Sequence, residues 1–428
     1  MNLSESGLSR NFLIIWFGQL ISSIGSGLTA FALGIFIYRE TGTATGYSLI
    51  ILCAFLPAFI LRPFGGTLSD RFDRRLMMMT GDLGSAAGLI FILIMMYLGN
   101  YNLWIIYSGI IISSVFVALQ NPAYKASVTD LLGENAYSKA SGLIQLAESS
   151  KFLLSPVIAG FLLTVWDIKS ILILDIFTFV VAVIAVFLIK QSEGKTKSGE
   201  SSTKFFEDLS EGFKYTFSNR GLVILLLITS LITLSVGFLQ ALFAPMVLSF
   251  TDAKTLGIMQ TVSATGMLIS SFLIGAFSKI KKQLKVLSFS LGIAGTFYAL
   301  MGISINIVFV VGAGFLFFCS LPFINSSLDV LIRKNADNKI QGRVWSIVSF
   351  ISQSGMLISF VTAGLFADYI FNPMFKKGGI LASSAGKIIG TGEGRGIGFM
   401  FIISGLFLVI IAAMTGRIEK IKEMDRQN

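Results

Sequence analysis

The amino-acid sequence predicts an all-α integral membrane protein with twelve transmembrane helices in two parallel-repeat six-helix bundles. Three observations predict this fold: the composition, the recurrence of long charge-free runs, and a segment that is repeated 200 residues later. Of the 428 residues, 54% are hydrophobic and only 13% are charged, whereas soluble domains carry about a quarter charged residues. The composition therefore excludes an ordinary soluble enzyme.

Charge-free runs long enough to cross a bilayer recur along the whole chain. A transmembrane helix needs about 20 predominantly apolar residues. The runs that reach this length are Asn11–Tyr38, Thr41–Leu61, Leu83–Tyr124, Gly221–Thr251, Thr255–Ser278, Val286–Leu328, Val344–Ala367 and Ile397–Gly416. The third and the sixth are of double length and contain polar breaks at 99–102 and 304–306, so each predicts two helices. The stretch Ser138–Lys190 adds two spans that contain charges, which brings the total to twelve.

The first run also bears on targeting. At 28 residues, Asn11–Tyr38 is longer than the apolar core of a signal peptide, which is about 7–15 residues. We therefore expect a retained first helix.

Lysine and arginine predict the orientation of the helices. With the N-terminus inside, 24 of the 33 basic residues fall on the cytoplasmic side, seven fall outside and two, Arg62 and Lys151, lie within helices. Because cytoplasmic loops of membrane proteins carry the excess of basic residues, we expect both termini in the cytoplasm and the protein in the cell membrane. The basic residues of the cytoplasmic loops then account for the net charge of +10, so this charge does not indicate a nucleic-acid partner.

A polar connection separates the two predicted bundles. We place the N-terminal bundle at 1–190, a cytoplasmic linker at 191–219 and the C-terminal bundle at 220–428. Within the linker, Phe206, Leu209, Phe213 and Phe217 recur at helical spacing among charged residues. This pattern predicts an amphipathic helix on the inner membrane surface, and a helix that docks a partner protein is the alternative.

The two halves share an internal repeat. Pro122, Ser127, Leu131, Asn135, Ala136, Lys139 and Gly142 are identical to the residues 200 positions later, which gives seven identities in 21 positions. Both copies begin on the same side of the membrane, so the repeat is parallel. Parallel six-helix repeats are typical of secondary transporters that rock about a central site. The chain has no Walker A motif, so ATP hydrolysis on this chain is excluded as the energy source.

A glycine, an acid and several arginines stand between the second and third spans, in the segment Gly65–Arg75. We expect a conformational latch here, in which the arginines reach a carboxylate on a neighbouring helix or anionic lipid. Its residues are Gly66, Asp70, Arg71, Arg74 and Arg75. The segment resembles the G-x-L-a-D-R-x-G-R-R signature of the major facilitator superfamily, with Asp73 where that family usually has glycine.

The fifth span contains Pro156 and Gly160, which predict a kink and close packing against the eighth span. Ordinary small-residue packing is the alternative. The segment Ser155–Gly160 is similar to a motif of antiporters in the same superfamily. Further segments of the sequence resemble the macrolide-efflux branch of drug exporters, including Trp16–Gln19, Asn121–Ala126 and Val165–Asp175. The resemblance implies the major facilitator fold and the export of hydrophobic drugs in exchange for protons.

Charged residues inside the spans are candidate sites for proton coupling, because burying a charge in a membrane is costly. Glu148 and Lys151 lie three residues apart on one face of the fifth span, with Glu148 near mid-membrane. They form either a proton site or a static ion pair. Asp82, Asp175 and Arg62 are further candidates, and structural roles are the alternative for each. Asp329 lies near the inner end of the tenth span.

Uncharged polar residues on several spans are candidates for lining a substrate cavity, with interhelical hydrogen bonding as the alternative. They are Gln19, Ser22, Ser26, Gln120, Asn121, Gln145, Gln240, Gln260, Asn325 and Gln353. The chain has no histidine and only two cysteines, so we expect no metal site, no enzyme activity and no cofactor besides the proton gradient. The external segment Asn372–Arg395 is glycine-rich, and its position predicts a mobile loop rather than a phosphate-binding loop.

These observations together predict a monomeric secondary transporter that exports amphipathic compounds, working with protons and membrane lipids. Two alternatives stay open. One is a transporter of the same fold that exports an endogenous metabolite, a siderophore or a lipid-like compound. The other is a membrane sensor or scaffold without transport.

Overall fold

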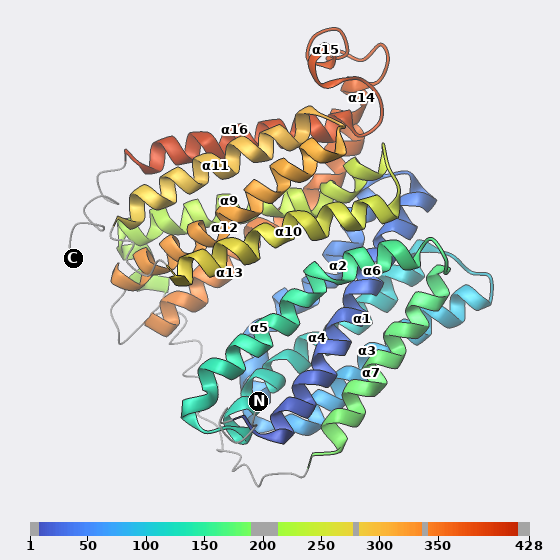
Figure 1. Ribbon diagram of the computed structural model, residues 1–428, viewed down its shortest axis with the longest axis vertical. Helices are drawn as coiled ribbons and strands as arrows, with labels where there is room; N and C mark the ends of the chain where they lie inside the picture. Colours follow the sequence, from blue (N-terminus) through green and yellow to red (C-terminus); the bar gives the residue numbers. More distant parts are fainter. Residues whose placement is uncertain (1–7, 190–212, 277–281, 336–340, 418–428) are drawn as a thin grey trace. The chain divides into compact units, whose positions relative to one another are not determined.

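A computed structural model describes residues 8–189, 213–276, 282–335 and 341–417, and all of its regular elements are helices (Figure 1). Long apolar runs form helices here because the hydrocarbon core offers no partner for a backbone N–H or C=O group, so these groups must bond within each helix. The chain divides into two compact units. Unit 1 comprises Met1–Gly42, Leu49–Glu200 and Ala253–Ile258, and unit 2 comprises Thr43–Ser48, Ser201–Asp252 and Met259–Asn428.

Most helices of the first half belong to unit 1. They are α1 (Arg10–Thr41), α2 (Ala44–Arg71), α3 (Arg74–Tyr97), α4 (Leu103–Leu131), α5 (Tyr137–Leu153), α6 (Ser155–Leu162) and α7 (Ile168–Phe187), with a short 3₁₀ turn at Glu134–Ala136. The first turn of α2 is the exception, because it packs in unit 2.

The helices of the second half lie mainly in unit 2. They are α9 (Arg220–Leu248), α10 (Ala253–Ala276), α11 (Gln283–Ile303), α12 (Ile307–Asn335), α13 (Gln341–Leu365), α14 (Asn372–Phe375), α15 (Gly386–Ile389) and α16 (Arg395–Thr415), with a π-helical turn at Phe366–Phe371. Here the first turn of α10 is the exception and packs in unit 1.

Eleven helices of the described part are long and apolar enough to cross a membrane. The remaining predicted span, the fifth, is divided into α5 and α6 at Leu154. Pro156 stands in the first turn of α6, where its missing N–H group costs no helical hydrogen bond. The predicted kink therefore takes the form of a break directly before this proline.

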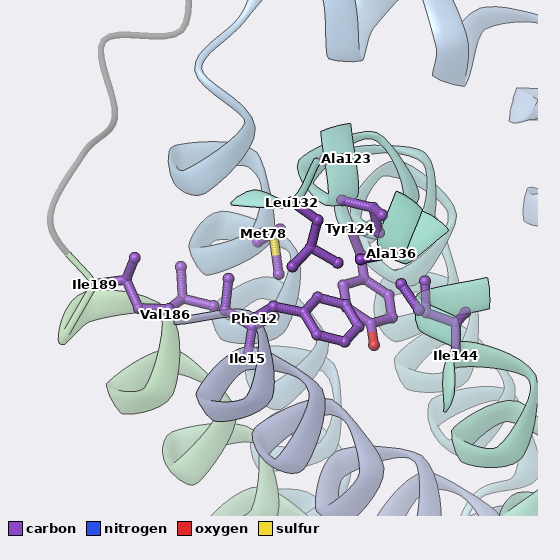
Figure 2. Packing of buried hydrophobic residues seen from close by; sticks show 12 residues of the cluster. Phe12, Ile15, Met78, Ala123, Tyr124, Leu132, Ala136, Ile144, Val186 and Ile189 are labelled. Carbon is purple, nitrogen blue, oxygen red and sulfur yellow. The ribbon is translucent and has the colours of Figure 1, made fainter. Parts of the chain in front are cut away.

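A hydrophobic cluster closes one end of unit 1 (Figure 2). Phe12 of α1 is fully buried among Met78 of α3, Tyr124 of α4, Ile144 of α5 and Val186 of α7. Because this cluster joins five helices, it stabilises the end of the unit that also carries the Gly65–Arg75 segment.

An aromatic cluster forms the core of unit 2. The ring of Tyr298 on α11 lies 5.4 Å from that of Phe317 on α12 and 5.1 Å from that of Phe401 on α16. Its hydroxyl donates a hydrogen bond of 3.0 Å to the Ser235 carbonyl on α9. Tyr298 thus ties together four helices without leaving its polar atom unpaired.

The segment between the π-helical turn and α16 folds back onto unit 2. Phe375 is fully buried and its ring lies 5.2 Å from that of Phe399. Arg395 is buried as well, and it donates to the Ile389 carbonyl at 3.0 Å and lies over the ring of Phe250. Where the sequence predicted a mobile loop, the structure has two short helices and a buried arginine.

The predicted amphipathic linker helix is described only in part. Residues 213–218 are helical, and the rings of Phe213 and Phe217 stack 5.2 Å apart on an exposed side. Phe206 and Leu209 lie outside the described residues.

Candidate functional site

The buried polar residues of unit 1 form a network around Asp82, which is 2% exposed. Gln19 of α1 donates to one carboxylate oxygen of Asp82 at 3.1 Å, and Gln120 of α4 donates to the other at 3.4 Å. Gln120 also donates to the amide oxygen of Gln19 at 2.6 Å. Three helices therefore meet at one carboxylate whose described partners are neutral amides.

This network places Gln19 and Gln120 differently from the sequence prediction. Both side chains are buried and bonded to Asp82, so in this structure neither lines an open cavity, and the alternative of interhelical hydrogen bonding describes them. Ser22 is buried too. The other cavity candidates of unit 1, which are partly or fully exposed, are Ser26, Asn121 and Gln145.

The cavity candidates on unit 2 also reach its surface. Gln240 and Asn325 are exposed, whereas Gln260 and Gln353 are half-buried. Exposed amides on helices this apolar are the pattern expected of cavity-lining positions, and their role stays a prediction.

A second buried carboxylate, Asp175 on α7, lies against α1. Thr178 donates to it at 3.1 Å, and a Cβ atom added at Gly25 would come within 2.6 Å of its Oδ1 atom. Lys151 of α5 interacts with Asp175 electrostatically. The absence of a side chain at Gly25 therefore lets α1 approach α7 closely beside this carboxylate.

Glu148 has a different partner from the one that the sequence suggested. Its carboxylate forms an ion pair of 2.8 Å with Lys125 of α4, and its side chain is 42% exposed. The prediction of a buried charge beside Lys151 is therefore wrong for Glu148. The physical reason is that α5 packs against α4 on one side and α1 on another, so two residues three positions apart meet different neighbours.

The Gly65–Arg75 segment contacts other helices of unit 1 through its arginines. Arg74 pairs with Asp130 of α4 at 2.8 Å and donates to the Ala126 carbonyl at 2.8 Å. Arg75 donates to the Val186 carbonyl at 3.1 Å and lies over the ring of Phe187. The expected contact between an arginine and a carboxylate on a neighbouring helix is present, while the role of this contact as a latch stays a prediction.

Four residues of the sequence prediction fall outside the side chains that the structure describes. They are Arg62, Gly66, Asp70 and Arg71, whose backbone belongs to α2.

The kinked span packs closely on the first turn of α10. A Cβ atom added at Gly160 would lie 2.7 Å from the Ala253 carbonyl oxygen, and one added at Gly257 would lie 2.2 Å from that of Pro156. The expected close approach of the fifth and eighth spans is thus present in unit 1.

Sequence reasoning missed a contact at the start of α2. Asp368, in the π-helical turn, accepts hydrogen bonds from the backbone N–H groups of Ala44 at 3.1 Å and Thr45 at 2.7 Å, and from the Thr45 hydroxyl at 2.6 Å. An acid at this place satisfies N–H groups that a helix leaves unpaired in its first turn. No local signal points to it, because the acid stands 323 residues away from Thr45.

Comparison with known proteins agrees with this architecture. The family model of the Major Facilitator Superfamily matches residues 15–360. Macrolide efflux protein A from Streptococcus pyogenes is 27% identical over 97% of both chains, and a protein of the same name from Enterococcus faecalis is 28% identical over 74% of this chain and 99% of its own. The crystal structure of the nucleoside transporter NupG superposes with a TM-score of 0.75 at 13% identity, covering 95% of this chain and 99% of that one. The chain belongs to the Major Facilitator Superfamily and is a multi-pass membrane transporter.

Proposed function

We propose that this transporter exports hydrophobic or amphipathic compounds such as macrolides across the cell membrane in exchange for protons, by alternating access. The observation that carries the proposal is the similarity to Macrolide efflux protein A, which extends over 97% of both chains. Because the similarity covers both halves, it includes every helix from which a substrate site would be built. The proton gradient is the proposed source of energy.

Glu148 is the carboxylate that we assign to proton exchange. It lies within a predicted span and its side chain is 42% exposed. The proposal is that this exposed side faces water, which delivers and removes the proton. Protonation removes its charge and with it the ion pair to Lys125, which weakens one contact between α4 and α5. A cationic substrate that binds the same carboxylate excludes the proton, and this competition would couple the two fluxes in opposite directions.

Asp82 and Asp175 are the other carboxylates available for this role. Both are almost completely buried and bonded to neighbouring side chains. A proton reaches them only if the helices around them move, so we rank them after Glu148.

The test uses everted membrane vesicles with an acidified interior and a pH-sensitive dye, to which a macrolide such as erythromycin is added. We expect partial collapse of the gradient with the unmodified chain and none with Glu148→Gln. The matched control is Asp329→Asn, which also removes an exposed carboxylate from an ion pair, here with Arg333 at 2.8 Å, and it should behave like the unmodified chain.

Each outcome decides a separate part of the proposal. If Glu148→Gln still exchanges protons and Asp82→Asn or Asp175→Asn does not, the assignment of the carboxylate is wrong and the antiport stands. If macrolides give no signal but a cell extract does, the substrate is an endogenous compound. Uptake of erythromycin that is unaffected by dissipating the pH gradient would overturn proton coupling.

A further inference from the structure

An open groove of about 1040 Å³ lies between α11 and α16 of unit 2. These two helices run side by side along one edge of the unit (Figure 1). Deep between them, a Cβ atom added at Gly295 would lie 2.5 Å from the Gly405 carbonyl oxygen. The helices therefore touch along part of their length, and the groove opens beside this contact.

Small residues form part of the lining. A Cβ atom added at Gly292 would meet only the Cβ atom of Ala412, at 3.9 Å. Ser288 donates to the Ala412 carbonyl at 2.6 Å, so its hydroxyl is already bonded. Two large aromatic residues that also line the groove are Phe289, which is 72% exposed, and Phe297. The groove is thus mostly apolar, with space left open at a glycine.

One end of the groove is basic. Lys282 and Lys285, both exposed, line it at the start of α11, and Gly416 lines it at the end of α16. Lys285, Phe289, Gly292 and Thr296 recur at spacings of three and four residues, which places them on one face of α11. At 1.5 Å per residue, the lining from residue 284 to residue 297 extends about 20 Å away from the lysines. This length slightly exceeds one leaflet of the hydrocarbon core, which is about 15 Å.

We propose that this groove binds one molecule of an anionic phospholipid, with its phosphate between Lys282 and Lys285 and an acyl chain along the face of Gly292. Charge complementarity favours this occupant, because basic residues at the end of a groove between transmembrane helices attract anionic headgroups. A zwitterionic lipid also brings an ammonium group toward the same lysines, and the repulsion between these positive charges makes its binding weaker. With the orientation predicted from the basic residues, the site faces the cytoplasmic leaflet.

Native mass spectrometry of the full chain in detergent tests this site, with dioleoylphosphatidylglycerol and dioleoylphosphatidylcholine as probes. We expect one phosphatidylglycerol to bind at least fivefold more tightly than phosphatidylcholine. Lys285→Gln should weaken the binding of phosphatidylglycerol by about fivefold and leave the binding of phosphatidylcholine unchanged. Gly292→Leu should weaken the binding of both lipids, because the new side chain fills space that is open in the groove.

Lys334→Gln is the matched control. Lys334 is an exposed lysine in the last turn of α12 and does not line the groove, so its removal should leave both affinities unchanged. Equal binding of the two lipids by the unmodified chain would overturn the proposal. It would also be overturned if Lys334→Gln reduced the affinity for phosphatidylglycerol as much as Lys285→Gln does. A chain dimer that disappears with Gly292→Leu would identify the groove as an interface between copies and would also overturn it.

Discussion

At the scale of single residues, the contacts around Asp82 show how a polar group can be kept inside a membrane protein. Its two oxygens accept from amides on two other helices, and one of those amides also donates to the other. A buried polar group that keeps its partner costs little, whereas one that loses its partner retains the full cost of desolvation. The network should therefore be sensitive to removal of its central acceptor.

We expect Asp82→Ala to lower the free energy of unfolding by about 1–3 kcal/mol. The substitution removes the acceptor of the Gln19 Nε2 group and one of the two acceptors of the Gln120 Nε2 group, which keeps its hydrogen bond to Gln19. Asp82→Asn keeps one acceptor oxygen and should therefore lower the free energy of unfolding by less than Asp82→Ala does. Thermal unfolding of the purified protein in detergent measures both. Asp329→Ala is the control, since this acid is partly exposed and forms a pair within one helix. An Asp82→Ala protein as stable as the unmodified one would show that the amides find other partners.

At the scale of helices, close approach depends on positions where a side chain is absent. Gly160 of α6 faces the Ala253 carbonyl, and the atoms nearest to it belong to the backbone rather than to a flexible side chain. Backbone gives way less readily than a side chain, so an added methyl group must push α6 and the first turn of α10 apart.

Gly160→Ala should therefore destabilise unit 1 by about 1–3 kcal/mol, the usual cost of overpacking a tight contact. Gly142→Ala on α5 is the matched control, because a Cβ atom there meets nothing within 4 Å. It should be neutral or slightly stabilising, since alanine favours a helix more than glycine does. Thermal unfolding of both variants compares the two sites, and equal effects would contradict the packing described for Gly160.

At the scale of the whole molecule, the distribution of basic residues predicts which ends of the helices face the cytoplasm. Lys387 belongs to the segment after α14, and Lys334 to the last turn of α12. With both termini inside, the first faces outward and the second inward.

Single cysteines at these two positions test the orientation. In a background where Cys53 and Cys319 are replaced by serine, a membrane-impermeant maleimide should label Lys387→Cys in intact cells. It should label Lys334→Cys only after the membrane is permeabilised. The reverse pattern would invert the topology and move the lipid site to the outer leaflet.

The agreement between sequence and structure is greatest where one property of a segment decides the outcome. Apolar runs became helices because a bilayer leaves the backbone no other choice. The break between α5 and α6 falls directly before Pro156, which has no N–H group to donate to the preceding helical turn. Arg74, after the second span, also reached a carboxylate on a neighbouring helix, although its identity as Asp130 was not predicted.

The partners of charged side chains followed a different rule. The spacing of Glu148 and Lys151 suggested a pair, yet Glu148 bonds to Lys125 and Lys151 interacts with Asp175. Asp368 reaches Thr45 across more than 300 residues of chain. Hydropathy therefore determined by itself that the chain is a membrane protein built from long apolar helices, because hydropathy is a property of each segment alone. Which polar groups meet was decided only by the tertiary structure, because it depends on how helices distant in sequence pack side by side.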